Sequence, residues 1–125
     1  MPGKKKTTGG DPALPQGSLD LLILRTLSGG AKHGYAVARH IQQVSDDFLR
    51  VEEGSLYPCL HRMERRGWIE AEWGVSESNR RAKYYCLTRA GRSQLKVEAA
   101  AWRDMVAAIG KVLGPAPPAP AASGA

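Results

Sequence analysis

Apolar residues recur every three or four positions in three stretches of the first half of the chain, which is the spacing of amphipathic α-helices. We predict these helices over residues 18–27, 34–45 and 53–66. Ser18 is the expected N-cap of the first helix, and the SGG run at residues 28–30 ends it. The side chains predicted to face inward are Leu19, Leu22, Ile23 and Leu27, then Val37, Ile41 and Val44, then Leu56, Leu60 and Met63.

The third predicted helix contains a proline, a residue that normally interrupts helices. We place Pro58 near the first turn, where its missing N–H costs little and its fixed φ suits the helix. Gly67 follows the last periodic residue and is expected to end the helix as a C′ glycine.

The pattern changes directly after this glycine. Residues 68–73 (WIEAEW) alternate and predict a strand, and residues 82–87 (AKYYCL) predict a second one. The polar segment between them, GVSESNRR, is the expected turn of a hairpin. Thr88 is positioned to cap a last helix that ends near Leu113, before Gly114 and Pro115.

This order predicts a mainly α protein with a small β-hairpin, namely a winged helix-turn-helix followed by a C-terminal dimerisation helix. In a helix-turn-helix the recognition helix enters the DNA major groove, and here the hairpin would lie beside it as a wing. We assign residues 16–87 to the winged helix-turn-helix and residues 88–114 to the dimerisation helix. The compositions of residues 1–15 (Lys, Gly, Thr, Pro) and 115–125 (Pro, Ala) predict disordered tails.

Charge adds a clue about the partner. The 18 lysines and arginines outnumber 12 acidic residues, and between residues 61 and 96 nine bases stand against four acids. Such clustering favours a polyanionic partner. The two cysteines lack metal-type spacing, and no apolar run approaches the length of a membrane span. We therefore expect a cytoplasmic protein that does not contact membranes.

The outward face of the third helix carries groups that donate hydrogen bonds to phosphates and base edges. Arg62 or Arg65 is suited to bind a guanine through two hydrogen bonds. The alternative is a solvated basic face without a partner, but the hairpin that follows favours DNA. The predicted DNA-facing residues of this helix are Ser55, Tyr57, Pro58, His61, Arg62 and Arg65.

The hairpin turn ends in three bases, Arg80, Arg81 and Lys83. Bases at the tip of a wing contact phosphates or enter a minor groove. The alternative is that they only keep an edge hairpin soluble. Their position beside a basic helix favours contact with phosphates.

Four segments together resemble the PadR family of bacterial transcriptional regulators, most closely its short, acidobacterial-type branch: GSLDLLILRTL, HGYAVARHI, EEGSLYPCLHRMERRGWI and EWGVSESNRRAKYYCLTRAGRSQL. The resemblance covers about residues 16–113. It implies a homodimer that binds double-stranded DNA at a roughly palindromic operator and represses transcription, with contacts from the third helix and the wing. It also implies that the start of the second helix lies near the DNA backbone, namely His33, Gly34 and Tyr35. A core tyrosine is the alternative for Tyr35.

The apolar residues of the last helix are spaced 4, 3, 4, 3 and 4 positions apart, which is the a/d seam of a coiled coil. Such a helix needs a partner, which is either a second copy of the chain or the first helix of the same chain. Both arrangements can occur on different faces. The predicted dimer interface consists of Leu95, Ala99, Trp102, Val106, Ile109 and Leu113.

Trp102 has a further interpretation. In some multidrug-sensing relatives a tryptophan at the matching place lines a pore between protomers, which implies that Trp102 binds a small aromatic effector. The alternative is an interface anchor, since tryptophan is enriched at interfaces. Trp68 and Trp73 are expected to pack in the core or within the hairpin.

Enzyme motifs are missing from the sequence: it contains no P-loop, no GxGxxG and no HExxH. We expect no catalysis, no metal and no cofactor. Cys59 and Cys86 are expected to be buried structural residues, with redox sensing as the alternative. Two rival functions remain: a winged helix that binds protein instead of DNA, and a dimer that mainly senses small molecules at Trp102.

Overall fold

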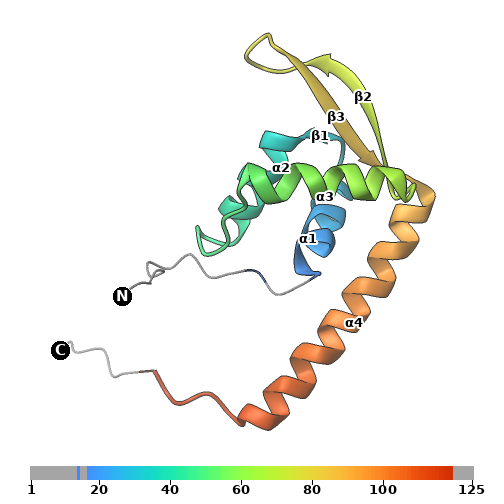
Figure 1. Cartoon of the computed structure of the whole chain (residues 1–125). Helices are drawn as coiled ribbons and strands as arrows, with labels where there is room; N and C mark the ends of the chain where they lie inside the picture. Colours follow the sequence, from blue (N-terminus) through green and yellow to red (C-terminus); the bar gives the residue numbers. More distant parts are fainter. Residues whose placement is uncertain (1–13, 15–16, 120–125) are drawn as a thin grey trace, which may run out of the picture.

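The computed structural model describes residue 14 and residues 17–119 of the chain. The elements are α1 (Ser18–Leu27), β1 (Lys32–His33), α2 (Gly34–Val44), α3 (Glu53–Arg65), β2 (Ile69–Val75), β3 (Arg81–Leu87) and α4 (Arg89–Leu113). Figure 1 shows a body made of α1, α2, α3 and the base of the sheet, with the β2–β3 hairpin extending from one end and α4 from the other. The predicted order of three helices, a hairpin and a last helix is confirmed.

The sheet has one strand more than the sequence predicts. Its order is β1-β3-β2, and both pairings are antiparallel. The two residues of β1, Lys32 and His33, lie opposite Tyr85 and Tyr84. A two-residue strand is too short to show an alternating pattern, so sequence periodicity cannot reveal it.

The core lies where α1, α2 and α3 meet the base of the hairpin. Val44 is a correction, because it is 69 % exposed at the end of α2 and does not face inward. Leu19 and Leu22 are partly buried at the edge of the core. The buried apolar residues are Ile23, Leu24, Leu27, Val37, Ile41, Leu56, Cys59, Leu60, Met63, Ile69, Tyr85 and Leu87.

The ends of α3 combine one confirmed expectation with one correction. Gly67 has φ +79°, and its N–H donates to the Glu64 carbonyl at 3.0 Å while that of Trp68 donates to the Met63 carbonyl at 3.1 Å. These two bonds form a Schellman motif, so Gly67 is the predicted C′ residue. Pro58 is the sixth residue of α3, beyond the first turn, and therefore leaves the Gly54 carbonyl without its helical donor.

The start of α1 also differs from the prediction. Gly17, with φ +84°, is the N-cap, and Ser18 is the first helical residue. A glycine fits this place because the left-handed conformation carries no Cβ penalty for it.

The root of α4 is joined tightly to the base of the hairpin. Thr88 caps the helix as predicted, since its hydroxyl oxygen accepts from the Gly91 N–H at 3.0 Å. The same hydroxyl donates to the Gly67 carbonyl at 2.6 Å, and the Thr88 N–H donates to the Trp68 carbonyl at 3.1 Å. Gly91 is buried against this Trp68 carbonyl, where a Cβ atom would have no room.

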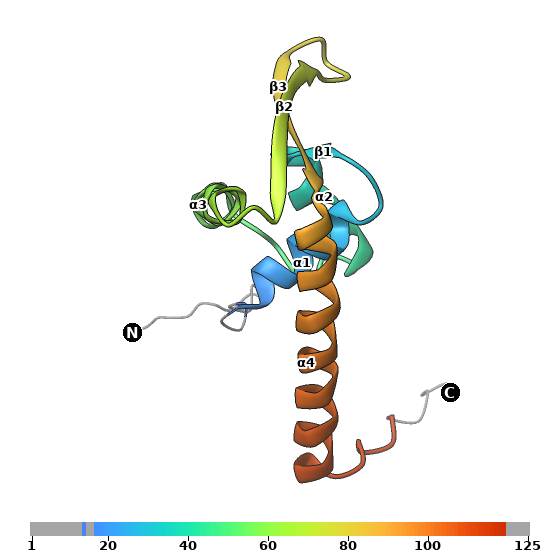
Figure 2. The same ribbon diagram turned by 90° about the vertical axis from the view of Figure 1, so that its right-hand side faces the viewer.

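Beyond its root, α4 projects from the body as a single rod, seen from two directions in Figures 1 and 2. Leu95 packs beside the core and the start of α4 contacts α1, so the predicted packing on the first helix holds for this part. Further along, apolar side chains of the seam and next to it are exposed within one chain: Trp102, Val106, Ile109 and Leu113 of the seam, and Met105 and Val112 beside it.

No helix within the described residues is long and apolar enough to cross a lipid bilayer. The predicted N-terminal tail lies outside the described residues, apart from residue 14. Of the predicted C-terminal tail, residues 115–119 are exposed and form neither helix nor strand, and residues 120–125 lie outside the described part.

Candidate nucleic-acid interface

A cleft of about 700 Å³ separates α3 and the start of α2 from the inner face of the hairpin. It exists because the hairpin is longer than the body that supports it. The pair Ile69–Leu87 is buried at the hairpin base, whereas Trp73 and Val75, on the same face further along β2, are exposed. The hairpin therefore overhangs α3 as a wing does, and its inner face lines the cleft.

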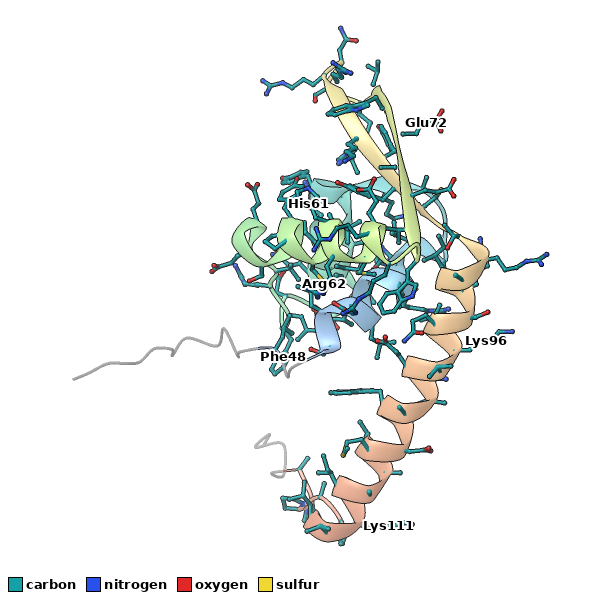
Figure 3. All side chains as sticks on the ribbon, turned by 45° about the vertical axis from the view of Figure 1, so that its right-hand side comes forward. Phe48, His61, Arg62, Glu72, Lys96 and Lys111 are labelled. Carbon is teal, nitrogen blue, oxygen red and sulfur yellow. The ribbon has the colours of Figure 1, made fainter. Side chains whose placement is uncertain are left out.

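Two neighbouring residues of α3 point to opposite sides of the helix. Figure 3 shows His61 on the side of the wing and Arg62 on the side of α1. His61 is exposed and lines the cleft. Arg62 instead donates from Nη2 to Oδ1 of Asp20, in α1, at 2.8 Å. The structure therefore separates two residues that were predicted to act on the same face.

The pair of Arg62 and Asp20 includes a third group, the thiol of Cys59. The thiol donates to the same Asp20 oxygen at 2.7 Å, and burial together with this carboxylate raises the pKa of Cys59 to about 12. The Asp20 side chain is only 13 % exposed, while that of Arg62 is 41 % exposed. Arg62 thus neutralises a nearly buried carboxylate and still turns part of its guanidinium to solvent.

Tyr57 forms a packing contact at the edge of the cleft. Its ring lies on Gly34 at the start of α2, so close that a Cβ atom there would be 2.8 Å from the tyrosine oxygen. Burial, and then the nearby Glu53 carboxylate, raise the pKa of Tyr57. The residue holds α3 against α2, and it also lines the cleft.

The other predicted residues of α3, Ser55, Pro58 and Arg65, are exposed. No side-chain hydrogen bond or ion pair within the described part of the chain engages His61 or Arg65. Both side chains are therefore available to an external partner.

The three predicted wing bases have different surroundings. Arg80 is exposed at the tip, where its backbone carbonyl accepts from the Ser76 N–H at 2.8 Å. The Arg81 guanidinium lies 4.3 Å from the centre of the Trp73 ring, which is a cation–π contact. Lys83 reaches back to α3, with Nζ 3.5 Å from Oε1 of Glu64.

The start of α2 lies at the other edge of the cleft. His33 accepts from the Ala36 N–H through Nδ1 at 3.2 Å and so caps α2, while its Nε2 lies 3.9 Å from Oε1 of Glu77 in the wing tip. Tyr35 is 58 % exposed and stacks beside His33, so the alternative of a core tyrosine is wrong.

Sequence reasoning missed part of this surface. Trp73 packs within the hairpin, which was one of the two expectations, since Arg81 lies over its ring. It is nevertheless 56 % exposed and lines the cleft, which the sequence did not predict. The strand pattern does not show that the hairpin extends beyond the helices that cover its base. Residues on its inner face become exposed from the point where these helices end. The contact between His33 and Glu77 was likewise not predicted, because it joins segments distant in the sequence.

The described residues offer no cluster of three or more His, Cys, Asp and Glu side chains that could hold a metal ion. Both cysteines are free thiols. The surface thus offers cations, hydrogen-bond donors and aromatic rings, which suit recognition of a polyanion.

Comparison with known proteins gives consistent matches. A family profile described as the transcriptional regulator PadR-like family matches residues 23–97. A transcriptional regulator of Mycobacterium tuberculosis is 34 % identical over 85 residues, which cover 68 % of this chain and 76 % of that protein. A transcriptional regulator from Clostridium thermocellum superposes with a TM-score of 0.72 at 28 % identity, covering 79 % of this chain and 96 % of that one. A PadR family regulator from Clostridium difficile gives 0.68 at 30 % identity, covering 78 % and 100 %.

Proposed function

Because the chain belongs to the PadR-like family of transcriptional regulators, we propose that it is a homodimeric repressor that binds a palindromic operator. Members of this family are transcriptional regulators and not enzymes, which confirms the predicted class of protein. A transcriptional regulator must reach the chromosome, so we propose that the protein is cytoplasmic.

The α3–wing cleft is the observation that carries this proposal. In our proposal α3 enters the major groove, with Ser55, Pro58, His61 and Arg65 toward the base edges. These side chains are exposed, and His61 and Arg65 make no competing side-chain contact among the described residues.

Phosphate contacts come from the two sides of the cleft. We assign them to Arg80, Arg81 and Lys83 of the wing and to Tyr35 at the start of α2. Arg62 contributes from the flank of α3, since one of its nitrogens pairs with Asp20 while part of the guanidinium faces solvent. Tyr57 supports the site by packing.

The exposed half of α4 supports the homodimer. Its apolar side chains line one stripe of the helix that the other described residues leave uncovered, and burial of such a stripe against a partner is favourable. In our proposal a second α4 covers the seam of Leu95, Ala99, Trp102, Val106, Ile109 and Leu113. Two recognition helices about 34 Å apart then read successive major grooves.

A small aromatic effector is a second proposal, carried by Trp102. Its indole is partly exposed on the seam, so in a homodimer two indoles approach each other across the interface. A flat compound stacked between them would quench tryptophan fluorescence, and Trp102→Ala would abolish the effect. No quenching by a panel of planar cations would count against this proposal.

The test of the main proposal is an anisotropy titration with the DNA upstream of the protein's own gene and a scrambled duplex, at several salt concentrations. Tight binding to the first DNA that survives the scrambled competitor supports a specific regulator. Arg80→Ala should weaken binding to both duplexes and reduce the salt slope by about one unit, and Lys96→Ala, on α4, is the matched control. Salt-independent binding, or none, would point to the rival role in protein recognition.

A further inference from the structure

We propose that Trp73 is an additional DNA contact, and that its indole packs on a deoxyribose of the strand that enters the α3–wing cleft. This inference rests on the proposed function, because it names the group that the inner face of the wing presents to the duplex.

The exposure of Trp73 is the starting observation. Its side chain is 56 % exposed on the inner face of the wing, next to the exposed Val75. Trp68, at the hairpin base, packs against the core and is partly buried. Exposed aromatic surface is unfavourable in water, and here it lies beside the cations of the wing, where a polyanion would bind. The fold uses one hairpin tryptophan for its core and leaves the other to an external partner.

The Trp73 ring is also held in place. The Arg81 guanidinium lies 4.3 Å from the ring centre, and the register of the sheet places Lys83 directly opposite Trp73. Both bases share the inner face of the wing with the indole. A restrained ring loses little conformational entropy on binding, which favours its use as a contact.

Cationic and apolar groups alternate on this surface, as phosphates and sugars alternate along a nucleic-acid strand. A flat apolar plate is flanked by cations at Arg81 and Lys83, with Arg80 at the tip. In the DNA backbone, apolar sugar faces lie between phosphate anions. The cations would lie against two phosphates and the indole against the sugar between them. A like-charged second copy fits this surface poorly, because the bases would repel one another.

A sugar contact makes two predictions that separate it from a charge contact. First, it releases no counterions, so Trp73→Ala should lower the affinity about tenfold at every salt concentration without changing the salt slope. Second, sugars carry no sequence information, so operator and scrambled duplexes should lose affinity equally. Arg80→Ala should instead flatten the slope.

The experiment measures these isotherms for the wild type, Trp73→Ala and Trp73→Phe, with Lys96→Ala, an exposed residue of α4 outside the seam, as the distant control. In parallel, DNA-induced changes in tryptophan emission are compared between Trp102→Phe and the double variant Trp102→Phe/Trp73→Phe, because their difference belongs to Trp73. Circular dichroism checks folding. If Trp73→Ala is unfolded, Trp73→Phe with its smaller parallel shift and the emission difference decide the matter.

We expect a parallel shift and a DNA-dependent emission change at Trp73. Unchanged affinity of Trp73→Ala, together with an unchanged Trp73 signal, would overturn the inference while specific binding by the wild type keeps the proposed function intact. A flattened slope for Trp73→Ala would assign the loss to a displaced Arg81 and overturn direct contact. If the wild type binds no duplex, the proposed function fails as well.

Discussion

The ion pair between Arg62 and Asp20 determines how the effects of mutating Arg62 in α3 should be interpreted. Arg62→Ala would remove the cation 2.8 Å from a carboxylate that is 13 % exposed, and among the described contacts of this carboxylate the Cys59 thiol would remain as donor. Breaking a fully buried pair in this way costs 3–5 kcal/mol, and the partial exposure of this pair reduces the expected loss to about 2 kcal/mol. Arg62→Ala should therefore destabilise the fold in addition to any effect on DNA.

The reverse change should cost less. Asp20→Asn leaves an arginine whose side chain is 41 % exposed and can be solvated, so we expect a loss of about 1 kcal/mol. The double variant Asp20→Asn/Arg62→Ala removes the unpaired carboxylate charge as well as its cation. It should therefore be no less stable than Arg62→Ala alone, and the two changes should be non-additive by about 1 kcal/mol.

Urea unfolding followed by circular dichroism measures these differences as shifts of the midpoint at constant slope. Arg65→Ala is the matched control, since Arg65 is an exposed arginine of the same helix. If Arg62→Ala moves the midpoint no more than Arg65→Ala does, the ion pair contributes nothing to stability and the reasoning is refuted. DNA titrations of folded Arg62→Ala then separate the proposed phosphate contact, which predicts equal loss on all sequences, from base readout, for which specific binding should fall more than non-specific binding. Equal loss on all sequences would exclude Arg62 from base recognition.

Three further predictions concern the rest of the chain. Gly91→Ala would force a Cβ atom into the Trp68 carbonyl, so thermal unfolding should show a loss of about 3 kcal/mol, and an unchanged Tm would contradict the close contact. Ile109→Glu places a charge on the exposed half of α4 and should give a folded monomer in sedimentation, with operator binding strongly weakened; a dimer of unchanged affinity would exclude this seam. Thiol reagents at pH 8 should modify Cys86 well before the buried Cys59. The pKa of Cys59 is raised to about 12 in the folded state, so above about pH 9 the thiol ionises in the unfolded chain but stays protonated in the folded one. The free energy of unfolding should therefore fall as the pH rises above about 9. Cys59→Ala should lack this part of the decline.

Periodicity predicted the fold well where one face of an element is buried. The apolar side of α3, the Gly67 cap and the hairpin all follow from local patterns that the tertiary structure preserves. Periodicity gave a wrong prediction where the apolar spacing continues beyond the residues that cover it. Val44 follows the helical spacing of α2 but lies past the edge of the core and is exposed.

The contacts of the candidate site were harder to predict from the sequence, because they join residues that are distant along the chain. A helical wheel places Arg62 on the outer face of α3, but it cannot show that Asp20, 42 residues earlier, captures the side chain. In the same way, the alternation of the hairpin gives the face on which Trp73 lies, but not the height at which the body stops covering it. Such residues become interpretable only when the packing of α1 and of the wing is known.

The contacts between the root of α4 and the hairpin base fix the direction in which this long helix leaves the body. Thr88 donates to the Gly67 and Trp68 carbonyls and Gly91 packs against the same Trp68 carbonyl, so the helix has little freedom to pivot at its root. Its 25 residues span about 37 Å, so a tilt of about 5° at the root corresponds to a displacement of about 3 Å at the far end. In a dimer held together along such rods, a small change in how the two rods cross becomes a change in the distance between the recognition helices. In the proposed dimer, the spacing of the operator half-sites would then depend on α4, far from the residues that we propose to contact DNA.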